Sequence, residues 1–380
     1  MIERRRIVRL WRQGGVSALV TLVRAKGSSY RQTGARLLLG GNGEYAGTIS
    51  GGCLEAEVMR KAGWMVRDGA VVQQYSTMFD DTAEVPFGLG CGGVVDLLVE
   101  PSGTAEFDAL MMAMERSLSV ERSMARSGER SVGERSLVVT WLPGEGKGLR
   151  RLVLGPDGSV VFASEGLGEK KLACAVGLRA GEEYEGRFVE ELETPQRLFV
   201  LGAGDDAKPL VSMAALLGWS VIVADGRGQL AKVERFPEAE RVVVGAASTL
   251  GIGAEDAVVA MTHSYEQDRE ILAAVLPVGP RYLGLLGARH RSSLLVNEAA
   301  GLLGMSVGEC CGRLFAPVGL DLGGDGPEAI ALAVMAEVQA VCQGKLGAAR
   351  RLSPEDVARY LREGGSSRYL QTECALDAVR

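Results

Sequence analysis

The sequence predicts an α/β protein: a C-terminal parallel sheet with helices on both faces, preceded by an N-terminal α+β domain. Two observations predict this. Residues 197–227 read as strand, glycine turn, helix and second strand, and the alternation of strands and helices continues to about residue 343. Before residue 195 the pattern is of short strands, hairpin turns and few helices. We therefore expect segments at 1–105, 106–195 and 196–345, followed by a partly disordered tail at 346–380.

The turn in this first strand–helix unit has the form G-x-G-x-x-A, with Gly202, Gly204 and Ala207 at the small positions. In a dinucleotide-binding turn the first glycine makes the tight turn. The second lets the backbone approach a pyrophosphate, and the third small residue lets helix and strand pack closely. Asp225 follows at the interval of about 20 residues that places an acid on a ribose hydroxyl. The unit predicts a Rossmann-like domain that binds NAD(P) or another nucleotide.

Charged residues near this turn leave a second interpretation open. Asp205 and Asp206 put negative charge where a pyrophosphate would bind, unless their side chains point outward. Arg227 lies two residues after Asp225 and could pair with it instead of contacting a ligand. A Rossmann-like domain that holds no ligand therefore remains possible.

Further along this domain, His263 follows the predicted strand 257–261. Ligands gather at the carboxyl ends of strands in open α/β sheets, so His263 could contact a cofactor or substrate. It could also cap the helix that follows. The basic turn 287–291 opens another helix and could bind an anion.

At the N-terminus the pattern predicts a basic helix over 3–13, a strand over 17–24 and a polar loop over 26–34. The loop carries Ser29 and Arg31, which could hold an anion together with backbone N–H groups. A solvated connection explains the loop equally well. Two short strands with a glycine-rich hairpin turn follow, at 36–39 and 45–49.

Ser50-Gly51-Gly52-Cys53 then opens a predicted helix that ends near residue 67. A cysteine in a first helical turn gains thiolate character from the free N–H groups and the helix dipole. Cys53 is therefore a candidate nucleophile, sulfur carrier or metal ligand, and Gly51 and Gly52 leave the sulfur accessible. The alternative is a small buried residue in a place that tolerates no bulk.

A second cysteine, Cys91, lies among glycines just before the predicted strand 94–100. The chain has no C-x-x-C pair, so zinc is not indicated. A helix is predicted over 107–130 and strands over 136–142, 151–154 and 160–163. A short helix over 354–362 is expected in the tail.

Bulk composition narrows the possible functions. The net charge of −6 argues against non-specific binding to nucleic acid or to an anionic membrane, and no apolar run approaches the length of a membrane span. Seven widely spread cysteines suit a reducing cytoplasm. The chain has two histidines, His263 and His290, which excludes a multi-histidine metal site.

Six blocks together resemble the XdhC/CoxI family: GSSYRQTGARLLL with GTISGGCLEAEV, GLGCGGVVDLLVEP, FVLGAGDDAKPL with LGWSVIVADGR, MTHSYEQD, YLGLLGARHR, and APVGLDLGGDGPEAIALAVMAEVQA. The resemblance covers nearly all of residues 14–344. It departs from the family at the turn containing Ala288 and His290, where relatives are usually richer in Pro, Ser or Arg. Any phosphate role of that turn is correspondingly in question.

The resemblance implies a maturation chaperone that binds molybdenum cofactor, supports its sulfuration and delivers it to the apo-enzyme of a xanthine dehydrogenase-type molybdenum hydroxylase. It implies that Cys53 and Cys91 handle the molybdopterin and contact its molybdenum, since sulfur donors suit soft metal centres. It assigns Gly202, Gly204, Asp225 and Arg227 to the Rossmann domain. A cysteine desulfurase, the hydroxylase and a second copy of the chain are the implied partners.

Two other functions remain as alternatives. The Rossmann-like domain could serve an NAD(P)-dependent oxidoreductase with His263 as acid and base. Cys53 could instead be the persulfide carrier of a sulfur-transfer enzyme. The pattern favours an accessory protein over an enzyme, because no convincing acid–base constellation accompanies the nucleotide turn.

Overall fold

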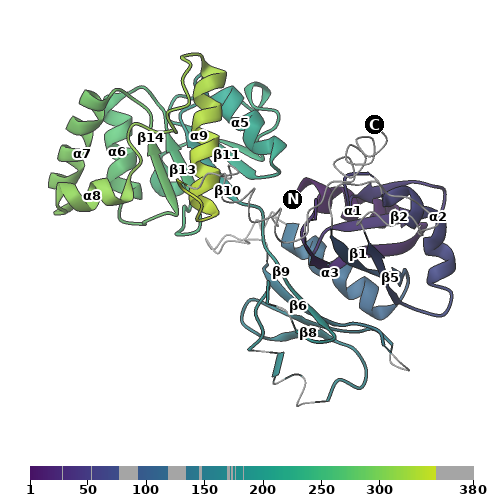
Figure 1. Cartoon of the computed structure of the whole chain (residues 1–380). Helices are drawn as coiled ribbons and strands as arrows, with labels where there is room; N and C mark the ends of the chain where they lie inside the picture. Colours follow the sequence, from purple (N-terminus) through teal and green to yellow (C-terminus); the bar gives the residue numbers. More distant parts are fainter. Residues whose placement is uncertain are drawn as a thin grey trace, which may run out of the picture.

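A computed structural model of the chain contains three β-sheets in its described part, each with its own helices or loops (Figure 1). The structure describes residues 1–27, 29–52, 54–76, 93–118, 134–144, 148–168, 172, 174–175, 177–182 and 184–347. Cys53, Cys91 and the predicted helix over 354–362 lie outside these ranges.

The N-terminal sheet is antiparallel, and the order of its strands is β3-β2-β1-β5-β4. On one face Val58 and Ala62 of helix α2 pack into a cluster with Val20. On the other face α1 and α3 bury Ile7 and Leu110 in a second cluster. The elements are α1 (Ile2–Gln13), β1 (Val16–Lys26), β2 (Arg36–Gly40), β3 (Tyr45–Gly47), α2 (Glu55–Met65), β4 (Val71–Ser76), β5 (Val94–Pro101) and α3 (Ala105–Leu118).

A second antiparallel sheet, of order β8-β7-β6-β9, packs against the same helix α3. Val138 and Val153 of this sheet share a cluster with residues of α1 and α3. Two buried ion pairs, Arg151–Glu100 and Arg36–Glu190, connect it to the N-terminal sheet. Its strands are β6 (Ser136–Trp141), β7 (Arg150–Leu154), β8 (Val160–Ala163) and β9 (Arg187–Leu192).

The C-terminal sheet is parallel, of order β12-β11-β10-β13-β14, with helices on both faces (Figure 1). This confirms the predicted fold class. Helices α5 and α9 cover one face, and α6, α7 and α8 cover the other. The elements are β10 (Arg197–Leu201), α5 (Ala207–Leu216), β11 (Ser220–Asp225), η1 (Val233–Arg235), β12 (Arg241–Val244), η2 (Ala247–Thr249), β13 (Ala257–Ala260), α6 (Tyr265–Val275), β14 (Tyr282–Leu285), α7 (Arg289–Leu303), α8 (Val307–Arg313) and α9 (Pro327–Cys342).

This strand order places the topological switch point between β10 and β13, which pair in parallel. The chain leaves β10 toward one face of the sheet and leaves β13 toward the other. The turn at Gly202 and the turn at His263 therefore open side by side at the carboxyl edge of the sheet. Ligands of open α/β sheets bind in the crevice at such a point.

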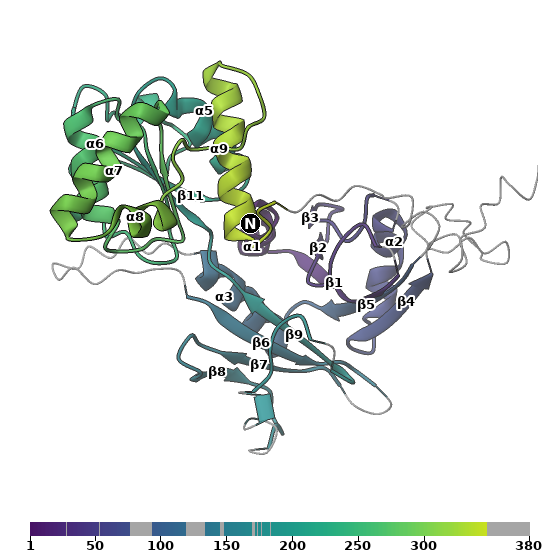
Figure 2. The same cartoon turned by 60° about the vertical axis from the view of Figure 1, so that its left-hand side comes forward.

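The two halves of the chain meet near the start of α1 (Figure 2). The connection from β9 to β10 is the short segment 193–196, and its Glu193 carbonyl accepts a hydrogen bond from Arg4 Nη1 at 2.7 Å. A Cβ atom at Gly218 would lie 2.8 Å from the Cβ of Met1, so α1 approaches the Rossmann-like domain closely.

Within the described ranges no single helix has both the length and the apolar character needed to cross a membrane. Helices α7 and α8 have that length and apolar character only when they are taken together, and they are bent by 114° where they join. No group of three or more His, Cys, Asp or Glu side chains in the same ranges could hold a metal ion. Cys53 and Cys91 lie outside that search, so their contact with molybdenum stays a prediction.

Candidate functional site

Two loops expected at the candidate site lie against each other in the N-terminal domain. A Cβ atom at Gly51 would lie 3.8 Å from the ring of Tyr30, so the ring covers the backbone of the Ser50–Gly52 turn. The hydroxyl of Ser29 donates to the Arg31 carbonyl at 2.8 Å and shapes the first loop. The structure thus brings Ser29, Arg31, Gly51 and Gly52 into one region, next to the position of Cys53 in the chain.

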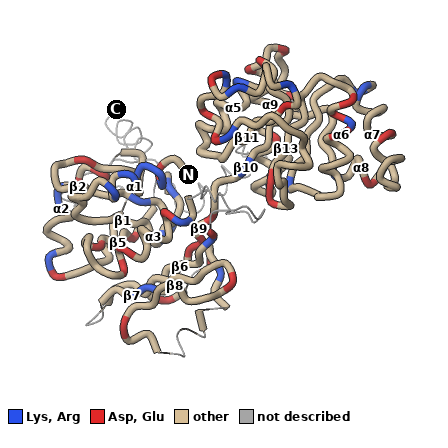
Figure 3. Tube along the Cα trace, turned by 180° about the vertical axis from the view of Figure 1, so that it is seen from behind, with Lys and Arg blue, Asp and Glu red and all other residues tan. Residues whose placement is uncertain are grey.

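Glu3, in the first turn of α1, connects these loops. One carboxylate oxygen accepts a hydrogen bond from Arg31, and the other accepts from Thr48 Oγ1 at 3.0 Å. Our sequence interpretation missed this residue. The available signal was one acidic residue in the first turn of a helix that is otherwise strongly basic, which Figure 3 shows as a run of blue.

Glu55 anchors the turn that precedes Cys53. Its carboxylate accepts from the N–H groups of Ile49 and Ser50, at 2.9 and 2.8 Å, and from the Ser50 hydroxyl. Burial alone would raise the pKa of Glu55, but these hydrogen bonds outweigh it and lower the pKa. Gly52 has φ of +111°, a conformation open to glycine but strained for other residues. An ionised carboxylate therefore holds this turn in a glycine-dependent shape.

Beside these loops is a cavity of about 410 Å³ lined by three arginines, Arg4, Arg31 and Arg36, against one carboxylate, Glu3. The Arg36 side chain is only 6% exposed; it pairs with Glu190 and donates to the Gly34 carbonyl. Its Nε atom is buried and has no hydrogen-bond partner among the described residues. A buried donor without a partner costs about 1–3 kcal/mol.

Arg4 adds to the positive character of this cavity. Burial, together with the nearby charge of Arg36, lowers the pKa of Arg4 to about 10. Glu190 and Glu193 act in the opposite direction, but burial and the charge of Arg36 outweigh them. An anionic ligand would relieve that repulsion.

In the Rossmann-like domain, contacts with backbone atoms require a glycine at position 202, whereas Gly204 closely approaches only a side chain. A Cβ atom at Gly202, where φ is +126°, would lie 2.4 Å from the Met261 carbonyl oxygen. A Cβ atom at Gly204 would lie 2.4 Å from Asp206 Oδ1. Ala207 is fully buried at the start of α5, as the third small position of the motif requires. The close approaches seen here involve protein atoms, whereas the motif led us to expect a pyrophosphate at the second glycine.

Asp225 is engaged on both carboxylate oxygens. Oδ2 accepts from the Ala203 N–H at 2.8 Å, and Arg227 donates to both oxygens at 2.9 Å. The Asp225 side chain has no exposed surface. Burial opposes ionisation, but the hydrogen bonds from Arg227 and the backbone prevail and lower its pKa. The pairing that the sequence left open is thus the arrangement in this structure, and a ribose could reach Asp225 only after Arg227 moved.

The two aspartates of the turn have different surroundings. Asp205 is 82% exposed and pairs with Lys208 and Arg235, whose hydrogen bonds lower its pKa. Its carboxylate therefore faces solvent, and the positive charges of Lys208 and Arg235 offset its negative charge. Asp206 instead turns back over Gly204 and forms a hydrogen bond with His263.

His263 has φ of +59°, the only positive φ of a non-glycine residue in the described part of the chain. Such strained residues cluster at functional sites. The ring is 61% exposed, and its Nε2 lies 2.7 Å from Asp206 Oδ2. The helix that follows is capped by Ser264, whose hydroxyl accepts from the Gln267 N–H, so capping does not explain His263.

A cavity of about 500 Å³ borders Asp225, between the ends of β11 and β12 and helix α6. Small residues dominate its wall, with Gly226, Gly245, Ala246 and Ala247 on one side and Ala274 on the other. Among the described residues no lysine or arginine lines it. A flat base such as adenine fits its size and polarity, whereas the described lining offers no cation for a 2′-phosphate.

Of the two arginines in the basic turn 287–291, Arg289 is exposed and Arg291 is engaged within the protein. Arg291 donates to Asp268, at 2.6 Å, and its guanidinium approaches the Leu286 carbonyl at 3.4 Å. Asp268 is fully buried and also accepts from the Thr262 hydroxyl at 2.6 Å. The Arg291 guanidinium therefore holds Asp268, and Asp268 in turn holds Thr262 in the turn after β13, beside the switch point.

The comparisons with known proteins agree on one family. Residues 198–338 match the family described as XdhC Rossmann domain, and residues 10–76 match the XdhC and CoxI family. A protein of Bacillus subtilis, described as a probable subunit of xanthine dehydrogenase, is 26% identical over 338 residues, which are 85% of this chain and 92% of the relative. The molybdenum cofactor insertion chaperone PaoD of Escherichia coli is 26% identical over 333 residues, 86% of this chain and 84% of the relative.

Among solved structures, a crystal structure from Bacillus halodurans described as a xanthine dehydrogenase superposes with a TM-score of 0.74. The match covers 93% of this chain and 99% of that chain at 24% sequence identity. A likeness at this identity bears on the fold, and it supports the arrangement of sheets described above.

Proposed function

This chain belongs to the XdhC and CoxI family, and from that premise we propose that it is a maturation chaperone which binds molybdenum cofactor as cargo and delivers it to a molybdenum hydroxylase. The names of two relatives support this proposal: one is a probable component of xanthine dehydrogenase, and the other is a molybdenum cofactor insertion chaperone. Both align with more than four-fifths of this chain.

The observation that carries the proposal is the cavity lined by Arg4, Arg31 and Arg36. Molybdopterin is a phosphate ester, and arginine N–H groups are well suited to phosphate oxygens. The cavity lies next to the loop of Tyr30 and Arg31, which contacts the turn that leads to Cys53. The phosphate would bind at the arginines, while Ser29, Gly51 and Gly52 would face the rest of the cargo.

The finer parts of the proposal concern the metal end of the cargo. Cys53 and Cys91 would contact the molybdenum or shield its terminal sulfur, because thiolates are soft donors. We also propose that the chain supports sulfuration of the cargo and meets a cysteine desulfurase. The same proposal includes a homodimer that acts in the cytoplasm.

Purified protein given molybdopterin anaerobically tests the proposal. We expect stoichiometric retention, measured as the oxidised fluorescent derivative after gel filtration. We expect retention to fall at least about tenfold in Cys53→Ser and in Arg31→Ala, since a lost charge-assisted contact commonly weakens binding by that factor. Cys311→Ser is the matched control, because Cys311 is an exposed cysteine on α8 in the other half of the chain.

Two results would count against the cargo proposal. The first is wild-type protein that retains no molybdopterin. The second is retention that is unchanged in Cys53→Ser, Cys91→Ser and Arg31→Ala alike. Trapping of a persulfide on Cys53 during turnover with a sulfur donor would favour the sulfur-transfer enzyme instead.

The small-residue cavity beside Asp225 supports a second function, nucleotide binding by the Rossmann-like domain. NAD(P) is the expected ligand, and the described lining, which carries no cation, favours NAD over NADP. Calorimetric titration with each nucleotide tests this. Hydride transfer to a small substrate that is lost in His263→Ala would instead favour the oxidoreductase.

A further inference from the structure

The outer face of helix α1 carries a concentration of positive charge that the cargo proposal does not use. In 12 residues this helix has one carboxylate, Glu3, and otherwise only basic charges: Arg4, Arg5, Arg6, Arg9 and Arg12. The chain as a whole has a net charge of −6, so the local charge of α1 is opposite in sign to that of the protein (Figure 3).

Two of these arginines are engaged within the protein. Arg4 donates to the Ser117 hydroxyl at 2.9 Å and to the Glu193 carbonyl at 2.7 Å. Arg12 forms an ion pair with Glu115 of α3. These contacts fasten α1 to its neighbours and account for Arg4 and Arg12.

The remaining three, Arg5, Arg6 and Arg9, form what we call the arginine stripe. All three are exposed, and none of their side chains has an ion pair or hydrogen bond with another described residue. Arg9 lies three and four residues after the other two, so the three cations are neighbours on the helix surface and repel one another. Arg5 and Arg6 also lie near the helix N-terminus, where the dipole disfavours positive charge. The stripe therefore does not stabilise the helix, and a role in binding explains it better.

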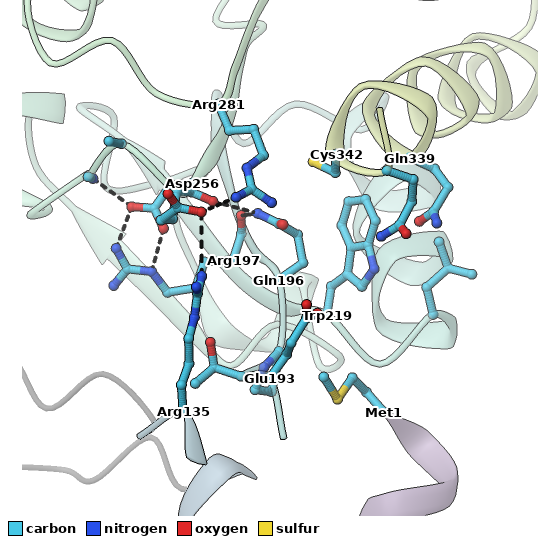
Figure 4. Close-up of a pocket in the computed structure, with 17 residues that line it drawn as sticks. Met1, Arg135, Glu193, Gln196, Arg197, Trp219, Asp256, Arg281, Gln339 and Cys342 are labelled. Carbon is cyan, nitrogen blue, oxygen red and sulfur yellow. Dashed lines mark hydrogen bonds and ion pairs between the residues drawn. The ribbon is translucent and has the colours of Figure 1, made fainter. Parts of the chain in front are cut away.

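The cavities beside α1 leave this charge uncompensated. The cavity of about 930 Å³ between the two halves of the chain takes Met1 from this end of the protein (Figure 4). Its own charges are balanced, because three arginines face three carboxylates: Arg135, Arg197, Arg281, Glu193, Glu255 and Asp256. The arginine-lined cavity takes Glu3 and Arg4 from α1, and no member of the stripe lines it. The excess positive charge thus begins with the residue that follows the lining of the arginine-lined cavity.

The chemistry of the stripe favours a protein partner that presents carboxylates. A guanidinium group can donate two parallel hydrogen bonds to one carboxylate, and arginine is enriched in protein interfaces. Lipid is disfavoured because the apolar residues of α1, Ile7, Val8 and Leu10, are buried in the core of the N-terminal domain. Nucleic acid is disfavoured by the net charge of −6.

We propose that the arginine stripe docks an acidic surface of the protein that receives the cargo. The first residues of α1 line the arginine-lined cavity and the stripe follows at once, so a partner docked on the stripe lies beside that cavity. The acidic character of the partner surface follows from the stripe, whereas its identity as a molybdenum hydroxylase rests on the proposed function. Opposite charges on the two proteins act mainly by raising the rate of association.

The test uses the full-length protein loaded with molybdopterin and, as the probe, the apo-enzyme of the molybdenum hydroxylase encoded in the same genome. Arg5→Gln, Arg6→Gln and Arg9→Gln are combined in one stripe variant. We expect its association rate constant at about 50 mM salt to be at least about tenfold lower than that of wild type. The difference should nearly vanish at about 1 M salt, where charges are screened beyond about 3 Å.

Matched variants separate the stripe from a general change of charge. Lys232→Gln, Arg241→Gln and Lys345→Gln combined remove the same charge from exposed positions of the Rossmann-like domain and should leave the association rate unchanged. Lysine at all three stripe positions should keep most of the salt-dependent attraction, because it keeps the charge. Thermal unfolding of the stripe variant should occur at the wild-type temperature or higher, since the substitutions remove repulsion.

Molybdopterin retention distinguishes this proposal from the cargo proposal. The stripe variant should retain molybdopterin as wild type does, because the stripe lies outside the arginine-lined cavity. Arg31→Ala should show the reverse, with weakened retention and an unchanged association rate. Wild-type protein that retains no molybdopterin would count against the cargo proposal, whatever the stripe does.

Four results would overturn the docking proposal. The first is no association of wild type with the apo-enzyme at about 10 µM. The second is an equal association rate in wild type and the stripe variant, and the third is an equal loss in the stripe variant and the charge-matched control. The fourth is stripe-dependent binding to RNA or to phosphatidylserine vesicles without association with the apo-enzyme, which would assign the stripe to another polyanion.

Discussion

His263 Nε2 lies 2.7 Å from Asp206 Oδ2, and this contact joins the turn after β13 to the turn after β10. It spans the switch point of the parallel sheet, where a ligand of a Rossmann-like domain would enter. The contact is made by a residue in the left-handed region of backbone conformation. The protein thus retains a strained histidine at this edge, although Ser264 already caps the next helix.

The strain at His263 predicts an unusual order of variant stabilities. His263→Gly and His263→Ala both lose the contact with Asp206, but only alanine keeps a Cβ atom at φ of +59°. A left-handed conformation costs a non-glycine residue roughly 1–2 kcal/mol. We expect His263→Gly to be more stable than His263→Ala by about 1 kcal/mol in urea denaturation. Equal stability of the two variants would show that the backbone there is unstrained in solution.

A methyl group at Gly202 should be among the most damaging substitutions in the Rossmann-like domain. Its Cβ would lie 2.4 Å from the Met261 carbonyl oxygen. Relieving this clash would require two backbone segments to move apart, which costs more free energy than moving a side chain. We expect Gly202→Ala to lower the free energy of unfolding by roughly 3 kcal/mol or more. Gly43→Ala is the control, since φ is also positive there but no atom lies within 4 Å. A loss at Gly202 no larger than the loss at Gly43 would contradict the close approach.

Asp225 should make stability depend on pH in the acid range. Its pKa in the folded protein lies below the ordinary value of 3.8, so its contribution is fully present above that value and is lost as pH falls through the folded pKa. We expect Asp225→Asn to cost about 2 kcal/mol at pH 7, because charge-assisted hydrogen bonds contribute roughly 1.5–3 kcal/mol. The difference from wild type should shrink as pH falls below about 4. Denaturation curves at pH 7, 5 and 3 measure this, and a constant difference would refute the role of ionised Asp225.

Glu55 should control the turn that precedes Cys53. Glu55→Gln keeps one oxygen for the N–H groups of Ile49 and Ser50, but it loses the charge that strengthens these bonds, and its NH₂ group cannot accept from the Ser50 hydroxyl. We therefore expect a loss of about 1–2 kcal/mol. Amide exchange at Ile49 and Ser50 should accelerate, and molybdopterin retention should fall with it. Glu57→Gln is the matched control on the same helix. It removes only a pair with Lys61 four residues on, worth about 0.3–0.5 kcal/mol. Slow exchange retained at Ile49 in Glu55→Gln would show that other contacts hold the turn.

Much of the fold was predictable from local pattern. The glycine turn at Gly202, the buried strands around it and the helix after it follow from residue spacing, because a parallel strand–helix unit is defined by neighbours in sequence. The hairpin at 36–47 was likewise signalled by its glycine-rich turn. The predicted helix over 107–130 begins close to α3, which is described as far as Leu118.

The side-chain partners were less predictable, because they depend on residues that are distant in sequence. Nothing near Glu3 indicates that it holds both Arg31 and Thr48, which lie 28 and 45 residues away. Arg36 looks like an ordinary strand residue until its partner Glu190 is found on another sheet. These long-range pairs create the arginine-lined cavity, and no local periodicity encodes them.

The sequence by itself determined the α/β class, the Rossmann-like turn and the family, because these depend on local spacing and on motifs that are contiguous in the chain. Only the tertiary structure decided how the polar groups pair. It committed Asp225 to Arg227 and Ala203, joined His263 to Asp206, and left Arg36 Nε without a partner among the described residues. The physical reason is that a buried polar group forms hydrogen bonds with the groups that tertiary packing places within about 3 Å of it. These groups often belong to segments that are distant in the sequence.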